Sequence, residues 1–291
     1  MMPAILTILL AFLLLPLAVW GQAWPSAMPV LNRSHPLMRD LRAWWVGWPG
    51  LAPSATWIDV VNRNDATLSG PNFTTVNGWN ALGRRGGAWQ VEFDASGALQ
   101  VTAPHASVYD FDRTNPFTIA AWVKSVATGS VGFLEKYQAT SPYQGYQLQL
   151  NTTGPYAVLG DTNSLALNAQ GTAAAAQDNQ WHQLVLRYDG SSTAAGIAWS
   201  MDGQPLAVSA SGGPLTGSTL NTRAPVFGAA GYFGAGALDD VRIWGRLLSD
   251  QEVSLLYTQS LRGDPELLSL PTGVPALPVA GKPGQFMPFF R

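Results

Sequence analysis

The feature that most constrains the fold of this chain is a series of segments in which apolar and polar residues alternate. Three of them are 117–123 (FTIAAWV), 146–150 (YQLQL) and 181–188 (WHQLVLRY). Such alternation places apolar side chains on one face of a β-strand. Turn signals separate the segments, and Asp202-Gly203 is typical of a tight hairpin. The sequence therefore predicts an all-β fold in which two antiparallel sheets pack face to face.

The composition agrees with many short strands, and a local sequence motif predicts one short C-terminal helix. The chain has 30 Gly, 21 Pro and 12 Trp, residues that suit turns and pleated faces. The helix is predicted from Ser249 to Ser260, because Ser249 and Glu252 form a capping box ahead of Val253 and Leu256. We expect this helix to close one edge of the sandwich.

The two ends of the chain differ from the middle, which gives three regions. Residues 1–23 are apolar and end in Gly21 and Ala23, so we expect a signal peptide cleaved after Ala23 or an uncleaved membrane anchor. Residues 32–260 form the sandwich, because no long Pro/Ser/Gly-rich stretch breaks them. Residues 261–291 contain six prolines and predict an extended tail. This organisation predicts a secreted or cell-surface protein, with a virion surface as the alternative.

Charge and cysteine content exclude several classes of function. Only 12% of residues are charged and the net charge is -2, which gives no electrostatic attraction for nucleic acid. The chain has no cysteine, so disulfides, thiolate metal sites and cysteine nucleophiles are excluded.

An ordered set of motifs resembles one family. The motifs lie at 41–45 (LRAWW), 57–68, 86–94, 117–124, 181–185 (WHQLV) and 236–244 (GALDDVRIW). In this order they are similar to the laminin-G-like family of concanavalin A-like jelly rolls, over roughly Asn32 to Tyr257. The lead-in at 32–37 resembles laminin-G-like proteins of tailed phages. The resemblance implies a jelly-roll β-sandwich, a fold that carries lectins, adhesion modules, hydrolases and structural proteins alike.

The sequence contains few residues in arrangements that support catalysis. Glycosidases need two opposed carboxylates, and the nearest pair here is Glu92 with Asp94. His35, His105 and His182 lie in unrelated contexts, and we expect no orienting partner beside His182. The sequence also has no Gly-x-Ser-x-Gly elbow. We therefore expect a protein that is not an enzyme, and a glycoside hydrolase is the minor alternative.

The family resemblance implies a structural Ca²⁺ ion. The positions that match the family's calcium loops are Asp59 and Asn62 with neighbouring Asn64 and Asp65, then Asp94, then Asp239 and Asp240. Neighbouring strand residues point to opposite faces, so only one of Asp239 and Asp240 is expected to ligate. The other is expected to be solvated or to pair with Arg242 or Arg246.

Aromatic residues beside amides suggest a carbohydrate-binding surface. We expect it at positions that read as loops between strands, namely Trp79, Asn80, Tyr143, Tyr146 and Tyr232. In contrast, Trp44, Trp122, Trp181 and Trp244 are predicted to pack in the core. The sequence thus predicts a non-catalytic recognition or adhesion module that binds a glycan or a protein surface. The alternative is a structural protein without a sugar ligand, attached to a membrane or virion through its N-terminal segment.

Overall fold

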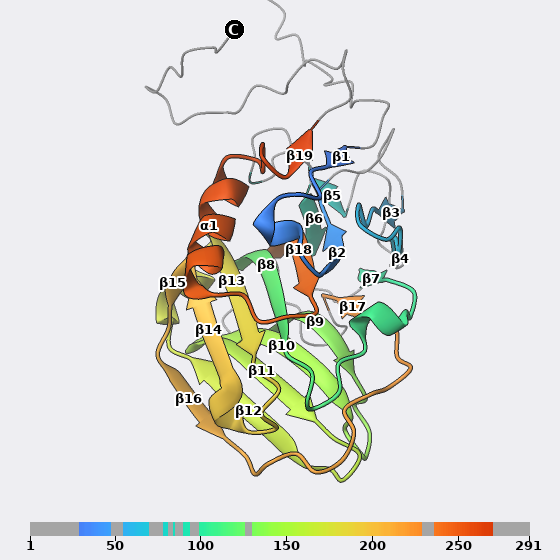
Figure 1. Cartoon of the computed structure of the whole chain (residues 1–291), viewed down its shortest axis with the longest axis vertical. Helices are drawn as coiled ribbons and strands as arrows, with labels where there is room; N and C mark the ends of the chain where they lie inside the picture. The colour runs from blue at the N-terminus through green and yellow to red at the C-terminus, as the bar shows by residue number, and fades with distance from the viewer. Residues whose placement is uncertain are drawn as a thin grey trace, which may run out of the picture.

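The computed structural model describes residues 29–47, 55–69, 78–80, 84, 90–93, 99–125, 130–228 and 236–269. In these residues the chain forms two large antiparallel sheets packed face to face and one α-helix, α1 (Asp250–Leu261) (Figure 1). The predicted all-β sandwich with one short C-terminal helix is confirmed.

The larger sheet has nine strands in the order β16-β12-β11-β10-β9-β17-β7-β4-β3. Their bounds are β3 Thr56–Trp57, β4 Ala66–Ser69, β7 Gln100–Thr102, β9 Val131–Tyr137, β10 Gly145–Asn151, β11 Gly154–Gly160, β12 Ala166–Gly171, β16 Val208–Ser211 and β17 Val226–Phe227. In β10 the predicted alternation holds, because Tyr146, Leu148 and Leu150 belong to the core and Gln147 and Gln149 face away from it.

The smaller sheet has the strand order β15-β14-β13-β8-β18-β6-β5, and β2 also pairs with β18. Their bounds are β2 Leu41–Trp45, β5 Trp79–Asn80, β6 Gln90–Phe93, β8 Phe117–Ser125, β13 Trp181–Tyr188, β14 Ile197–Met201, β15 Gln204–Pro205 and β18 Gly236–Trp244. The hairpin from β14 to β15 turns at Asp202 and Gly203, which have φ angles of 52° and 78°. Two positive φ angles are required by a type I′ turn, so the predicted hairpin is confirmed.

The core lies between the two sheets and is rich in aromatic rings. Trp45 packs edge-on against Phe227 with ring centroids 4.8 Å apart, and Phe111 stacks on Phe117 at 4.6 Å. Each fully buried side chain of this size contributes about 1.5–3 kcal/mol to stability. A chain without disulfides is therefore held by burial of apolar area.

A second apolar cluster covers the outer face of the smaller sheet. Val253 and Leu256 of α1 pack with Ala120, Val185 and Trp244 of the strands. The capping box of α1 is present: Ser249 Oγ accepts from the N–H of Glu252 at 3.2 Å, and the N–H of Ser249 donates to Glu252 Oε2 at 2.9 Å. The predicted helix is confirmed, and it covers one sheet face rather than closing an edge.

Three of the four predicted core tryptophans are buried. Trp44 and Trp244 are in the second cluster, and Trp122 is stacked beneath Tyr257 of α1. The prediction was wrong for Trp181, which is only half-buried. Trp181 is the first residue of β13, where fewer strands surround a side chain.

The domain extends beyond the predicted limits of 32 and 260. Strand β1 (Val30–Leu31) pairs with β19 (Leu268–Ser269), which brings the two ends of the domain together. Leu267 is buried in the second cluster, so residues 261–269 belong to the domain rather than to a tail. Apolar side chains there outweigh the effect of Pro265.

The segments 1–28 and 270–291 lie outside the described residues, as do the predicted signal peptide or anchor and the rest of the tail. Within the described residues, no helix has the length and apolarity needed to cross a bilayer.

Candidate binding face

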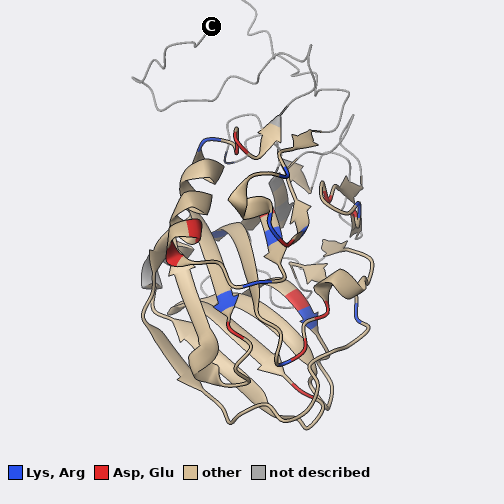
Figure 2. Ribbon diagram, viewed as in Figure 1, with Lys and Arg blue, Asp and Glu red and all other residues tan. Residues whose placement is uncertain are grey.

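The outer face of the larger sheet is the best candidate site, because α1 covers the smaller sheet instead. Its neighbouring strands β10, β11, β12 and β16 contain no charged residue. Figure 2 shows this part of the molecule almost free of charged residues. A ligand on this face would meet neutral polar groups.

Pairing across the strands places side chains, all polar except Val158, in two rows. The first row runs from Gln147 through Val158 and Asn168 to Ser211, and the second from Gln149 through Tyr156 and Gln170 to Ser209. Residues opposite one another in a sheet share a face. We call this surface the amide face, made of Glu135, Tyr137, Gln147, Gln149, Tyr156, Val158, Asn168, Gln170, Ser209 and Ser211.

Hydrogen bonds hold half of the amide face in place, namely Glu135, Gln147, Tyr156, Asn168 and Gln170. Tyr156 Oη donates to Asn168 Oδ1 at 2.6 Å, and Gln170 Nε2 donates to the carbonyl of Pro155 at 3.1 Å. Gln149 differs from the other amides of the face, because its half-buried side chain hydrogen-bonds to no other described residue. Its amide can therefore donate to and accept from a ligand.

Glu135 is the single acidic residue in β9–β12 and β16. Gln147 Nε2 donates to its Oε2 at 3.0 Å. Burial raises the pKa of Glu135, while the hydrogen bond from Gln147 and the charge of Arg223 act in the opposite direction. One carboxylate without an acidic neighbour on the face lacks the pair that glycoside hydrolysis needs.

Tyrosines mark one end of the amide face. Tyr143 is 46% exposed, and its carbonyl lies so close to Gly160 that a Cβ there would be 1.9 Å from the oxygen. Tyr137 Cε2 lies near the same glycine, at 3.1 Å from that Cβ position. The glycine thus lets the Tyr143 loop lie directly on β11. The predicted exposure of Tyr143 is confirmed, and its role in binding stays a prediction.

Two other predicted ligand-binding residues are in the core, so these predictions were wrong. Trp79 is 2% exposed and Tyr146 is 4% exposed, and both pack between the sheets. Trp79 was expected in a loop but lies in β5, and the register of β10 turns Tyr146 inward. The side chain of Asn80 and the whole of Tyr232 lie outside what the structure describes.

The sequence prediction missed most of the amide face. It considered aromatic residues near glycines, whereas the signal lay in amides at alternate positions: Gln147 with Gln149, and Asn168 with Gln170.

The predicted calcium residue Asp59 accepts hydrogen bonds from backbone N–H groups in and around a turn. It is fully buried, and its carboxylate accepts from the backbone N–H groups of Trp44 and Val61, both at 3.0 Å, and of Asn62 and Asn64. Burial raises the pKa of Asp59, and these hydrogen bonds oppose the change. Asn62 directs its amide elsewhere, donating to the carbonyl of Arg42 at 2.7 Å.

Asp239 and Asp240 lie in a buried ionic cluster with arginines. Asp240 Oδ2 is 2.8 Å from Arg242 Nη2 and 3.2 Å from Arg84 Nη2, and Asp239 Oδ2 is 3.7 Å from Arg84 Nε. A bulge in β18, where Asp240 has φ 60°, brings both carboxylates to one arginine. The expectation of opposite faces was therefore wrong, while the pairing with Arg242 is confirmed.

The predicted calcium ligands that the structure describes all have other partners. No group of three or more His, Asp or Glu side chains in the described ranges is placed to hold a metal ion. Backbone N–H groups and arginines bond to the carboxylates of Asp59, Asp239 and Asp240 in this structure, and the predicted ligand set stays a prediction. Asp94 lies outside the described residues, and calcium binding itself stays a prediction.

His182 has partners that the sequence did not predict. Its Nδ1 is 2.7 Å from Asp202 Oδ2, and its Nε2 is 3.2 Å from Asp178 Oδ1. The hydrogen bond to Asp202 raises the pKa of His182, burial lowers it, and Asp178 adds to the increase. This histidine clamp joins β13 to the hairpin at Asp202, which is a structural role.

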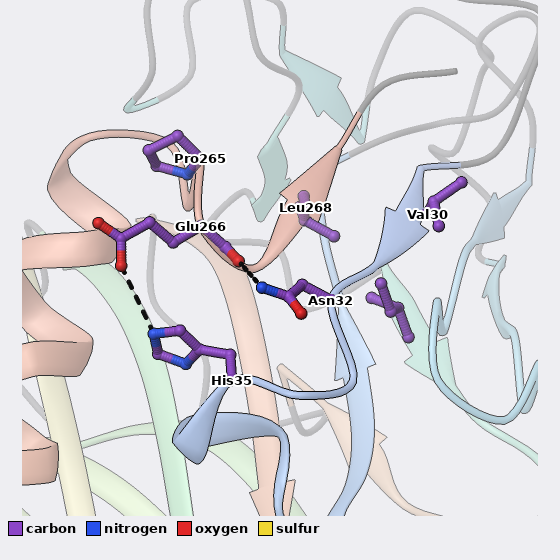
Figure 3. Close-up of a pocket in the computed structure, with 7 residues that line it drawn as sticks. Val30, Asn32, His35, Pro265, Glu266 and Leu268 are labelled. Atoms are coloured by element: carbon purple, nitrogen blue, oxygen red, sulfur yellow. Dashed lines mark hydrogen bonds and ion pairs between the residues drawn. The ribbon is translucent and has the colours of Figure 1, made fainter. Parts of the chain in front are cut away.

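A pocket of about 550 Å³ lies where the ends of the domain meet. Figure 3 shows Glu266 and His35 directed toward one another, with Glu266 Oε2 at 3.6 Å from His35 Nε2. Asn32 Nδ2 donates to the carbonyl of Glu266 at 2.9 Å, and His35 Nδ1 accepts from the N–H of Leu37. These polar groups connect the two ends.

Comparison with known families agrees with this architecture. The model of a laminin-G family, described as the concanavalin A-like lectin/glucanases superfamily, matches residues 93–254, more than half of the chain. The chain belongs to this superfamily. No curated protein matches the sequence.

Several solved structures with a similar fold are binding domains of toxins. The binding domain of Paraclostridial Mosquitocidal Protein 1 aligns with TM-score 0.59 and 12% identity, covering 76% of this chain and 52% of that one. The binding domain of botulinum neurotoxin serotype G gives 0.56 and 16%, covering 76% and 51%. The serotype D ligand binding domain, in complex with N-acetylneuraminic acid, gives 0.54 and 10%, covering 75% and 50%. At such identities the likeness shows the fold alone, and this superfamily member spans about half the length of those chains.

Proposed function

We propose that this chain is a non-catalytic recognition module whose amide face binds a neutral glycan. The observation that carries the proposal is the cross-strand register of Gln, Asn, Ser and Tyr side chains on strands without charged residues. Amides match sugar hydroxyls because they both donate and accept hydrogen bonds, and tyrosine rings pack against the apolar faces of sugar rings.

The absence of cations on these strands favours a neutral ligand over an acidic one. Lys136 is the single Lys or Arg in β9–β12 and β16, and its buried Nζ is 2.7 Å from Asp110 Oδ1. It faces away from the amide face, so within these strands a sugar carboxylate would find no cationic partner; the exposed Arg223, whose charge acts on Glu135, lies outside them and is already beside a carboxylate. The sialic acid complex of the serotype D domain supports a sugar ligand for this fold, but not the same sugar.

A glycan array probed with the full chain, followed by calorimetry on the strongest hit, tests the proposal. We expect Gln149→Ala and Tyr156→Ala to weaken binding about tenfold each, since each removes a contact worth roughly 1–1.5 kcal/mol. Tyr257→Ala is the matched control, because Tyr257 is a half-buried tyrosine on α1. Equal affinity in all variants would show that the glycan site lies outside the amide face. If the folded protein bound no glycan at all, the result would favour the alternative of a structural protein without a sugar ligand.

Turnover of the bound glycan is the test for catalysis. We expect no release of reducing ends, because Glu135 has no second carboxylate on the amide face. Release that disappears in Glu135→Gln would overturn this expectation.

We also propose that the module is displayed outside the cell, on a cell or virion surface. The apolar segment at residues 1–23 supports this proposal. Sequencing the N-terminus of the mature protein tests it: a start at Trp24 would indicate a cleaved signal, and a start at Met1 would indicate an anchor or a cytoplasmic protein.

A further inference from the structure

The larger sheet ends in an unprotected edge strand. The two strand orders end on β16, β3, β15 and β5. Three of these strands are two residues long, and β15 contains Pro205, whereas β16 has four residues. Edge strands are usually shortened, charged or interrupted by proline, which prevents pairing with another chain. β16 contains neither a charge nor a proline, and it is twice as long as the other three strands.

The outward backbone groups of β16 are available for pairing. The N–H of Thr172 donates to the carbonyl of Ala207 at 2.9 Å, and β16 continues in register along β12. The backbone N–H and C=O groups of successive residues point to opposite edges of a strand. The groups that point toward β12 therefore belong to Ala207, Ser209 and Ser211, and those that point away from it belong to Val208 and Ala210. No described residue hydrogen-bonds to these outward groups.

Nothing in the surrounding chain repels a second strand. Residues 203–222 include no Asp, Glu, Lys or Arg. Ser209, Ala210 and Ser211 are small and exposed, and β16 lies at the outer edge of the molecule (Figure 1). An approaching strand would meet neither charge nor bulk.

We propose that the chain forms a twofold dimer in which β16 pairs antiparallel with β16 of a second copy. The strand is its own complement: Val208 pairs with the partner's Ala210, Ala210 pairs with the partner's Val208, and the axis passes beside Ser209. The four outward groups of each strand are then satisfied by the same groups of the other. A second copy fits this edge because the same two residues supply donors and acceptors on both sides.

The dimer extends the larger sheet and its amide face across both copies. Ser209 is on the amide face, so the two faces lie side by side in one continuous sheet. If the proposed glycan function holds, a repeating ligand would be held at two sites, which increases its overall affinity. The dimer itself does not depend on that function.

A pair of cysteine variants tests the register, since the chain has no cysteine of its own. In the proposed dimer the two Ser209 residues form a non-hydrogen-bonded pair with Cα atoms about 4.5 Å apart, within the span of roughly 4.4–6.8 Å that a disulfide requires. Ser211 has the same exposure and the same face. Its two copies would be separated by four residues along the strands, or roughly 13 Å.

We expect the full chain carrying Ser209→Cys to form a covalent dimer on mild oxidation with glutathione disulfide, and the Ser211→Cys chain to remain monomeric on a non-reducing gel. Equal cross-linking of both variants, or of neither, would overturn the proposal.

Sedimentation of the full chain without cysteine provides an independent measurement. We expect a dimer for the natural sequence and a shift toward monomer for Ala210→Pro, which removes an outward N–H and leaves the pairing with β12 intact. The N-terminal segment is the same in both chains and cannot cause the difference. A monomeric natural chain, or an unchanged mass for folded Ala210→Pro, would refute the pairing of β16.

Discussion

The histidine clamp makes the stability of the domain depend on pH. His182 lies between Asp202 at 2.7 Å and Asp178 at 3.2 Å, and its pKa is raised chiefly by the hydrogen bond to Asp202. A raised pKa means that the folded protein binds this proton more tightly than the unfolded chain, whose histidine titrates near 6.5. The contribution is fully present below pH 6.5 and is lost as the pH rises through the folded pKa.

The size of this contribution to stability depends on how exposed the two aspartates are. A hydrogen bond between charged groups contributes about 1.5–3 kcal/mol when sheltered. The side chains of Asp178 and Asp202 are 42% and 27% exposed, so water screens both contacts. This screening reduces the contribution to about 1 kcal/mol. For a domain of this size that is about 2–4 °C in melting temperature.

The assay is thermal unfolding of the natural chain and of His182→Gln, from about pH 5 to about pH 9, the range over which a histidine titrates. We expect the natural chain to be more stable by these few degrees at low pH, and the gap to narrow as the pH rises. Asp202→Asn is the matched variant: it keeps the hairpin but removes the nearer charge, and should flatten the pH dependence. A gap that stays constant or widens with pH would refute the reasoning.

Four further predictions concern stability. Ser249→Ala removes the capping hydrogen bond of α1 and should cost about 1 kcal/mol in urea unfolding; an unchanged midpoint would contradict a role for the cap. Leu148→Ala leaves a cavity in the core and should cost about 2–5 kcal/mol in the same assay. Arg242→Met leaves Asp240 and Asp264 without this partner in a buried site, and should cost about 3–5 kcal/mol; a loss under about 1 kcal/mol would mean that water reaches the cluster. For the calcium prediction, the melting temperature should rise more in calcium chloride than in sodium chloride of equal ionic strength, because a ligand that binds the folded state stabilises it. An equal rise in both salts would contradict the prediction of calcium binding.

The sequence determined the local elements, because their signals are local. Alternation in 146–150 and 181–188 gave the strands, Asp202-Gly203 gave the hairpin, and Ser249 with Glu252 gave the start of the helix. Each depends on the backbone preferences of neighbouring residues, which do not change when the chain folds. The family resemblance then joined these elements into the correct sandwich.

Only the tertiary structure decided which side chains are free to act. Trp79 and Tyr146 looked like loop aromatics, but strand register turned them into the core. In a regular strand neighbouring side chains point to opposite faces, but the bulge at Asp240 brings Asp239 and Asp240 to the same arginine. The partners of His182 come from separate segments of the chain.

The amide face shows the same division most clearly. Gln147, Gln149, Asn168 and Gln170 are at alternate positions in the sequence, so each strand alone predicts a polar side. Short hairpins align the sides of β10, β11 and β12, whereas the pairing of β12 with β16 and the packing of α1 on the other sheet join segments far apart in the chain. A hairpin turn sets register locally, but the pairing of distant segments depends on the burial of the whole core, which no local pattern in the sequence encodes.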